Sequence, residues 1–171
     1  MGKETVITIE RMKKSDIDQV LAIEQESFSH PWSRNLFLSE FRSMVSLLLV
    51  SLADDPALRR VTGYIISWLV ADEMHILNLA VAPAFRRHGI ARRLVLAALL
   101  QASLKGAKKA FLEVRVSNSS AQKLYSDLGF TGSSIRRDYY DAPVEDAVIM
   151  TLEQGALEHI VKTVSSANCA W

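Results

Sequence analysis

The stretch from residue 75 to residue 104 constrains the fold of this chain more than any other part of the sequence. It begins with the apolar run HILNLAVAPAF, which is typical of a buried strand, and ends with RRLVLAALLQASL, which has no Gly or Pro and is typical of a helix. Between them lie residues 86–91, RRHGIA, which we expect in a strand-to-helix turn and in the first turn of the helix. The start of a helix leaves backbone N–H groups unpaired and carries partial positive charge, so this turn suits a phosphate or pyrophosphate.

The order of the expected elements indicates the fold class. Segments rich in Val, Ile and Leu and bounded by turn residues predict strands near 5–10, 44–52, 61–70, 74–81, 109–116, 130–138 and 145–152. Capping residues followed by apolar stripes predict helices over 15–28, 33–42, 90–105 and 119–128. Because the strands come in a run first and alternate with helices only later, we predict an α+β (mixed α/β) fold with a mixed sheet rather than a doubly wound parallel sheet.

Composition argues against several classes of protein. A chain of 171 residues is expected to form one main domain, and its formal net charge of +1 gives no global basic field, so no direct nucleic-acid partner is expected. No apolar run approaches the roughly 18 residues of a membrane span, and MGKETVITIERMKK lacks the apolar core of a signal peptide. The single cysteine, Cys169, has no partner for an internal disulfide, so we expect a cytoplasmic protein. The oligomeric state is not fixed by the sequence, with a monomer slightly favoured.

The turn matches the pattern [Q/R]-x-x-G-x-[G/A], with Arg86, Gly89 and Ala91 at the fixed positions. Gly89 lets a ligand approach the backbone, Ala91 keeps the next turn narrow, and positive potential comes from Arg86, Arg87, Arg92 and Arg93. The chain lacks both G-x-x-x-x-G-K-[ST] and G-x-G-x-x-G, which disfavours a nucleoside triphosphate or a dinucleotide. Taken alone, the pattern is equally compatible with a basic loop before a helix.

The turn and two later stretches together resemble the GNAT superfamily of N-acetyltransferases. The later stretches are LEVRVSNSSAQKLYSDLGF at 112–130 and IRRDYYDAPVEDAVIMTL at 135–152; with SHPWS at 29–33 they are most similar to the bacterial ribosomal-protein-alanine N-acetyltransferases (RimI). The resemblance implies a GNAT domain over residues 1–153, with a mixed, mostly antiparallel sheet, splayed central parallel strands and flanking helices. Residues 154–171 form a C-terminal tail in which one face of a short helix could be lined by Ala156, Leu157, Ile160, Val161 and Val164.

In that family the cosubstrate is acetyl-CoA, and the resemblance implies that it lies between the splayed strands with its pyrophosphate on the turn. The main chain of Leu79 and Val81 matches positions that pair with the pantetheine arm and polarise the thioester carbonyl. Asn118 matches an asparagine that contacts coenzyme A, although its place before a helix also fits an N-cap. The expected cofactor-binding residues are Leu79, Ala80, Val81, Arg86, Arg87, His88, Gly89, Ile90, Ala91, Arg92, Asn118 and Tyr125.

Glu113 is the candidate general base. Acetyl transfer needs a neutral amine, and because the α-amine of a protein N-terminus has a reference pKa near 7.7–8.0, a modest base suffices. Alternation within FLEVRV places Glu113 on one strand face with Phe111 and Arg115, where it could equally be a solvated carboxylate paired with Arg115. The resemblance implies that Glu113 acts as the base, directly or through one water.

Tyr125 is the candidate acid. A phenol with a reference pKa near 10 can donate its proton to a departing thiolate. Tyr125 also lies on an apolar helical stripe with Ala121, Leu124 and Leu128, which fits a core residue. Both can hold, because a buried ring can direct its hydroxyl into a cleft. The resemblance implies the acid role.

The segment RRDYYDAPVED is the candidate acceptor-peptide site. Tyr139 and Tyr140 would form aromatic walls, and the carboxylates around them would favour a basic peptide segment. The alternative is a solvated hairpin with two tyrosines packed across it. By resemblance, Pro31 and Trp32 are expected to form the opposite wall.

These features predict an enzyme that transfers acetyl from acetyl-CoA directly to the N-terminal alanine of a small-subunit ribosomal protein. Two alternatives stay open: the same chemistry on other protein N-termini, lysine side chains or a small amine, and a non-catalytic acyl-CoA-binding regulator. The four histidines have no metal-ligand spacing, so no metal is expected. The lack of G-x-S-x-G disfavours an acyl-enzyme.

Overall fold

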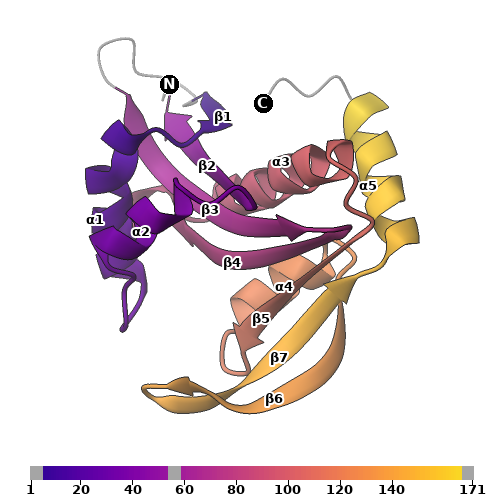
Figure 1. Cartoon of the computed structure of the whole chain (residues 1–171). Coiled ribbons are helices and arrows are strands. Elements are labelled where there is room, and N and C mark those ends of the chain that lie inside the picture. The colour runs from indigo at the N-terminus through magenta and orange to yellow at the C-terminus, as the bar shows by residue number, and fades with distance from the viewer. Residues whose placement is uncertain (1–5, 54–58, 167–171) are drawn as a thin grey trace.

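A computed structural model describes residues 6–53 and 59–166 and contains one seven-stranded sheet (Figure 1). The strand order is β1-β2-β3-β4-β5-β7-β6, in which only the β4–β5 pair is parallel. The strands are β1 (Ile7–Arg11), β2 (Ser46–Ala53), β3 (Arg60–Val70), β4 (Glu73–Val81), β5 (Lys109–Arg115), β6 (Thr131–Asp141) and β7 (Val144–Leu152). This mixed, mostly antiparallel sheet confirms the predicted fold class.

Helices cover both faces of the sheet (Figure 1). They are α1 (Ile17–Ser27), α2 (Arg34–Glu40), α3 (Ile90–Leu104), α4 (Ser119–Ser126) and α5 (Gln154–Ser166), with single 3₁₀ turns at η1 (Lys14–Asp16) and η2 (Pro83–Phe85). One apolar core lies between α1, α2 and the sheet, and a larger one lies under α3, α4 and α5. The central strands β2, β3 and β4 alternate their side chains between these two cores, so apolar residues occupy both faces of these strands. β6, by contrast, is exposed along nearly its whole length.

The parallel pair separates shortly after it begins. β4 and β5 are in register only from Glu73 opposite Lys109 to Ile76 opposite Leu112. On its other edge β4 stays paired with β3 up to Val81, so the strand itself continues. The remainder of β4, residues 77–81, therefore has no partner strand on its β5 side among the described residues. This is the splay that the resemblance implied.

A β-bulge lies where the two strands separate. The β3–β4 register shifts between Ile66, which is opposite Asn78, and Ser67, which is opposite Ile76, so Leu77 is an extra residue on β4. Leu77 packs with the core beneath α1 and α2, and the Asn78 side chain bonds to groups of that same core. The bulge thus places the consecutive side chains of Leu77 and Asn78 on one face of β4. It also changes the direction of the strand where the opening begins.

Helix α5 packs on the larger core. Leu157 is 2% exposed, and four further apolar residues of the helix are partly buried there: Ala156, Ile160, Val161 and Val164. Their spacing by three and four residues forms one apolar stripe along the helix. Residues 154–166 therefore contribute to the same hydrophobic core as α3.

We expect Leu157→Ala to lower the free energy of unfolding by roughly 2–5 kcal/mol, because it leaves a cavity in a packed interface. The matched control is Leu104→Ala at the end of α3, where the side chain is 78% exposed and little stability should be lost. Urea unfolding followed by circular dichroism measures both variants. Equal effects would contradict the packing of α5 on the core.

Candidate active site

The strand-to-helix turn has the backbone conformation expected of an anion-binding loop. Gly89 precedes α3 with φ 72°, and Arg87 also has a positive φ, 67°. A Cβ added at Gly89 would meet no atom within 4 Å, so the space above this residue is open. The N–H of Arg93 bonds to the carbonyl of Gly89 at 3.1 Å and is the first to donate along the helix. The backbone N–H groups that precede Arg93 have no acceptor within the helix, so they point away from the start of α3, as is usual at a helix N-terminus.

The side chains of the turn differ in what they contact. Arg86 turns back, with Nε 3.0 Å from the carbonyl of Val81 and Nη2 3.1 Å from Ser27 Oγ, so it ties the turn to β4 and α1. His88 Nδ1 lies 2.8 Å from the carbonyl of Arg86. Ile90 is buried in the core, which leaves only its backbone for a ligand. Arg87, His88 and Arg92 are exposed, and so is Arg86 despite its two hydrogen bonds.

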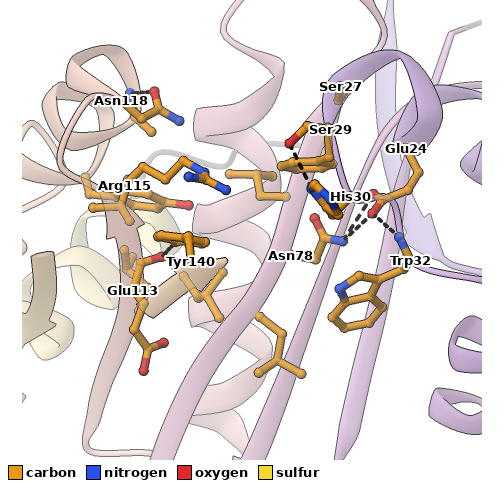
Figure 2. A pocket seen from close by; sticks show the side chains of 18 residues that line it. Glu24, Ser27, Ser29, His30, Trp32, Asn78, Glu113, Arg115, Asn118 and Tyr140 are labelled. Atoms are coloured by element: carbon orange, nitrogen blue, oxygen red, sulfur yellow. Dashed lines mark hydrogen bonds between the residues drawn. The ribbon is translucent and has the colours of Figure 1, made fainter. Parts of the chain in front are cut away.

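A cavity of about 480 Å³ lies where β4 and β5 separate (Figure 2). Its walls come from α1 and the loop after it, from residues 76–79 of β4, from residues 112–115 of β5, and from α4 and β6. It brings together six of the predicted site residues: Trp32, Leu79, Glu113, Asn118, Tyr125 and Tyr140. The predicted residues outside its lining are Pro31, Ala80, Val81, Tyr139 and the turn residues from Arg86 to Arg92.

Glu113 lies on β5, on the strand face opposite the buried Leu112 and Val114 as the alternation predicted. It lines the cavity, and its side chain is 9% exposed. It does not pair with Arg115, which bonds instead to Glu145 at 3.0 Å and lies over the ring of Tyr140. The alternative that made Glu113 a partner of Arg115 is therefore wrong. The carboxylate points away from the Glu24 side of the cavity (Figure 2).

The partner of Glu113 is His75, which sequence analysis missed. His75 Nε2 lies 2.6 Å from Glu113 Oε2, and Arg136 Nη1 lies 3.4 Å from Oε1. An ionised carboxylate only accepts, so the imidazole N–H donates. The hydrogen bond from His75 lowers the pKa of Glu113 against the opposing effect of burial, and the Arg136 charge lowers it further. His75 also stacks on Phe111, its partner in the parallel register.

Tyr125 lies both in the core and at the cavity, the position that the sequence allowed for a buried ring with its hydroxyl toward a cleft. Its ring is buried in the larger core against Phe130, and the residue also lines the cavity. Burial raises the pKa of Tyr125 well above its usual value, so the phenol stays protonated at neutral pH. No hydrogen bond from this hydroxyl occurs within residues 6–53 and 59–166, which leaves it available as a donor.

Asn118 is confirmed as the N-cap of α4. Its Oδ1 accepts a hydrogen bond from the N–H of Ala121 at 3.1 Å and another from Ser120 Oγ at 3.0 Å. The side-chain carbonyl is therefore used by the helix. Because Asn118 also lines the cavity, its amide nitrogen is the part that a ligand could contact.

The β6–β7 hairpin presents Tyr139 and Tyr140 as an edge-to-face pair with ring centroids 5.0 Å apart. Tyr140 lies on the cavity side, where its hydroxyl is 3.4 Å from the carbonyl of Glu113, and burial raises its pKa to about 12. Tyr139 is 39% exposed beneath Arg136. The hairpin thus carries one tyrosine in the cavity wall and one outside it.

Two carboxylates of the hairpin are used for internal contacts. Glu145 accepts from Arg115 and from the N–H of Ser117, and Asp146 accepts from the N–H of Asp138. They cannot serve freely as the acidic surface that was expected to attract a basic peptide. Across the rim, Ser29 Oγ donates to the carbonyl of Ala142 at 3.3 Å and joins the α1–α2 loop to the hairpin.

Among the described residues, no three His, Cys, Asp or Glu side chains cluster as a metal site would require. In the same ranges no helix is both long and apolar enough to cross a membrane.

Comparison with known proteins agrees with this geometry. The Acetyltransferase (GNAT) family model matches residues 17–130. The [Ribosomal protein bS18]-alanine N-acetyltransferase of Salmonella typhimurium is 36% identical over 148 residues, which are 85% of this chain and 96% of the relative. This chain belongs to the GNAT family of acetyltransferases. The family resemblance inferred from the sequence is therefore confirmed, and the protein is an acetyltransferase.

Solved structures of GNAT proteins have the same fold. The crystal structure of the ribosomal-protein-S18-alanine N-acetyltransferase from Escherichia coli has a TM-score of 0.79 and 32% identity, covering 87% of this chain and 94% of that one. Arabidopsis thaliana NAA60 in complex with acetyl-CoA has a TM-score of 0.79 at 15% identity, covering 88% and 99%. Because the identity is low, the similarity to NAA60 concerns the fold alone.

We expect His75→Leu to raise the pKa of Glu113, because the largest cause that lowers it is the hydrogen bond from His75. Arg136→Gln should raise it less, since the charge of Arg136 is a smaller cause. A carboxylate with a lowered folded-state pKa stabilises the fold above its unfolded pKa, and this stabilisation is lost as pH falls through the folded value. The loss of folding stability on acidification should therefore be smaller in His75→Leu than in the wild type. ¹³C NMR titration of the Glu113 carboxyl measures the pKa, and an unchanged value in His75→Leu would contradict the assignment.

Proposed function

We propose that this GNAT enzyme transfers the acetyl group of acetyl-CoA to the N-terminal alanine of the ribosomal protein bS18. The observation that carries the proposal is the cavity between β4 and β5, where Glu113, Tyr125 and Tyr140 meet in a chain 36% identical to the Salmonella enzyme of that name. We infer direct transfer in one complex of enzyme, acetyl-CoA and peptide.

The opening fits an extended cosubstrate. Residues 77–81 of β4 have a free edge toward β5, so their backbone can pair with the pantetheine arm near Leu79 and Val81. The open space above Gly89 and the free amides at the start of α3 would hold the pyrophosphate, with Arg87 and Arg92 adding positive charge. Asn118 lies on the opposite wall. Acetyl-CoA, once bound here, supplies the acetyl group as a thioester.

Glu113 and Tyr125 would move the two protons of the reaction. Glu113 takes a proton from the acceptor amine, directly or through one water, as the nitrogen forms a bond to the acetyl carbon. Tyr125 gives its proton to the sulfur as the carbon–sulfur bond breaks. The lowered pKa of Glu113 makes it a weak base, which is adequate because the α-amine is itself half neutral near pH 7.7–8.0.

The acceptor peptide would lie between two walls. Trp32 comes from the α1–α2 loop, next to the exposed Pro31, and Tyr140 comes from the hairpin together with Tyr139. These aromatic groups would supply contact area. Because Glu145 and Asp146 bond within the hairpin, a preference for a basic peptide would rest on the exposed Asp138 and Asp141. We infer a cytoplasmic enzyme that needs no nucleic acid, membrane or metal, with a monomer slightly favoured.

Mass spectrometry tests the acceptor. The purified enzyme is incubated with acetyl-CoA and an alanine-first peptide that matches the bS18 N-terminus and contains one internal lysine. Acetylation of the α-amine alone supports the proposal. Acetylation of the lysine, of other N-termini to the same extent, or only of small amines would favour the corresponding alternative acceptor. No acetylation of any amine, with coenzyme A still bound, would indicate the non-catalytic regulator.

We expect Gly89→Val to weaken coenzyme A binding at least tenfold, about 1.4 kcal/mol, because the new side chain fills the space proposed for the pyrophosphate. Gly106→Val is the matched control: Gly106 also has a positive φ (98°) and open space for a Cβ, but it lies after the other end of α3. Both variants carry similar backbone strain. Calorimetry with coenzyme A measures the affinities, and equal losses would overturn the role of the turn.

We expect Glu113→Gln to lower turnover by roughly 10²-fold, because the amide keeps the shape but cannot accept the proton. The loss should shrink above the pKa of the acceptor amine, since the amine is then already neutral. Glu73→Gln on β4 is the control, because Glu73 pairs with Lys109 outside the cavity. pH–rate profiles on one alanine-first peptide measure both. A wild-type profile for Glu113→Gln would show that another group is the base.

A further inference from the structure

Glu24 is a buried carboxylate that the reaction does not use. It lies on α1, is 1% exposed and forms part of the cavity wall (Figure 2). No Lys, Arg or His within the described ranges forms an ion pair with it. Burying a carboxylate removes its hydrogen bonds to water, which is costly unless groups of the protein replace them. The hydrogen-bond donors around Glu24 therefore explain how the fold tolerates this residue.

Three donors from three separate segments bond to Glu24. The backbone N–H of Trp32 in the α1–α2 loop donates to Oε1 at 2.8 Å, and Asn78 Nδ2 on β4 donates to Oε2 at 3.1 Å. The Tyr64 hydroxyl on β3 donates to Oε2 and is fully buried. Burial, with the nearby Glu24 charge as the second cause, raises the pKa of Tyr64 far above its usual value, so this group remains a donor.

These contacts join two walls of the cavity. The bond to Trp32 fixes the loop that supplies the aromatic side of the proposed peptide slot. The bond to Asn78 holds β4 immediately after the bulge at Leu77, where the strand has no partner on its β5 side. The Glu24 carboxylate is the one group that contacts both segments among the described hydrogen bonds.

We propose that Glu24 is a positioning residue for acceptor binding, which sets the α1–α2 loop against the bulged part of β4 and so fixes the position of the Trp32 wall of the peptide slot. The inference deepens the proposed function and rests on it for the nature of the acceptor. It assigns Glu24 no contact with the acceptor and no proton in the reaction.

Glu24→Gln tests this role because it keeps the shape and removes one of two acceptor oxygens. The single oxygen of the glutamine can accept from Trp32 or from Tyr64 but not from both, since the NH₂ group that replaces the other oxygen is itself a donor. We expect the KM for the alanine-first peptide to rise at least fivefold. Turnover at saturating peptide should change less than threefold, and coenzyme A affinity should fall by less than the peptide KM rises.

Glu40→Gln is the matched control. Glu40 is also a buried glutamate, 5% exposed, and also accepts from two donors, Ser46 Oγ and Trp68 Nε1. It lies on α2 outside the cavity lining. The substitution therefore removes a buried carboxylate of the same kind without touching the slot. A rise in peptide KM confined to Glu24→Gln supports the positioning role, and equal rises or an unchanged KM overturn it.

Two further measurements separate this proposal from the proposed function. The amide proton of Trp32 should move upfield in the ¹H–¹⁵N spectrum of Glu24→Gln, because it loses a bond to a charged acceptor; an unmoved resonance overturns the inference whatever the acceptor is. Failure of the wild-type enzyme to acetylate the peptide, with the shift present, would refute the proposed acceptor alone. If Glu24→Gln does not fold, Tyr64→Phe is measured in the same way, and an unchanged peptide KM there overturns the role.

Discussion

The early end of the pairing between β4 and β5 is the constraint on which the rest of this structure depends. Four register pairs hold the strands together, from Glu73–Lys109 to Ile76–Leu112, and then the backbone of β4 faces a cavity. A buried strand edge without a partner is costly, so a chain retains one only where a ligand or water satisfies it. The bulge at Leu77, the turn at Gly89 and the cap at Asn118 all lie around this one opening.

Two carboxylates on the cavity wall are stabilised in different ways, and their behaviour should differ accordingly. Glu113 is held by His75 and Arg136, groups that carry or can acquire positive charge, so its proton affinity depends on its neighbours. Glu24 is held by neutral donors alone among the described residues. The first arrangement tunes an ionisation, whereas the second fixes a distance between two segments. In the proposed function Glu113 therefore serves the chemistry, and in our further proposal Glu24 serves the geometry.

Local patterns were sufficient for the sheet, the helices and the turn, because each depends on residues close in sequence. Gly89 and the Asn118 cap are examples, and the order of elements correctly predicted the mixed sheet. β6 was predicted to end at residue 138 but continues to Asp141, because cross-strand pairing with β7 outweighs the weak strand propensity of its charged residues. The contact between His75 and Glu113 could not be read from either segment, since it depends on the register of two strands 38 residues apart. Glu24 falls within the predicted helix 15–28, but its donors come from β3, β4 and a loop, which no local pattern indicates.

The position of β7 has a consequence for synthesis of the chain. β7 lies between β5 and β6 and pairs with β5 from Ala147 opposite Arg115 to Leu152 opposite Ala110. During translation β5 therefore emerges with one edge unpaired, and that edge is covered only after residue 152 has left the ribosome. The nascent chain exposes an apolar strand throughout this interval, which is the kind of edge that recruits other chains or chaperones. The cavity therefore cannot take its final form until β7 has emerged, because β5, which forms one of its walls, pairs with β7 on the edge that faces away from β4.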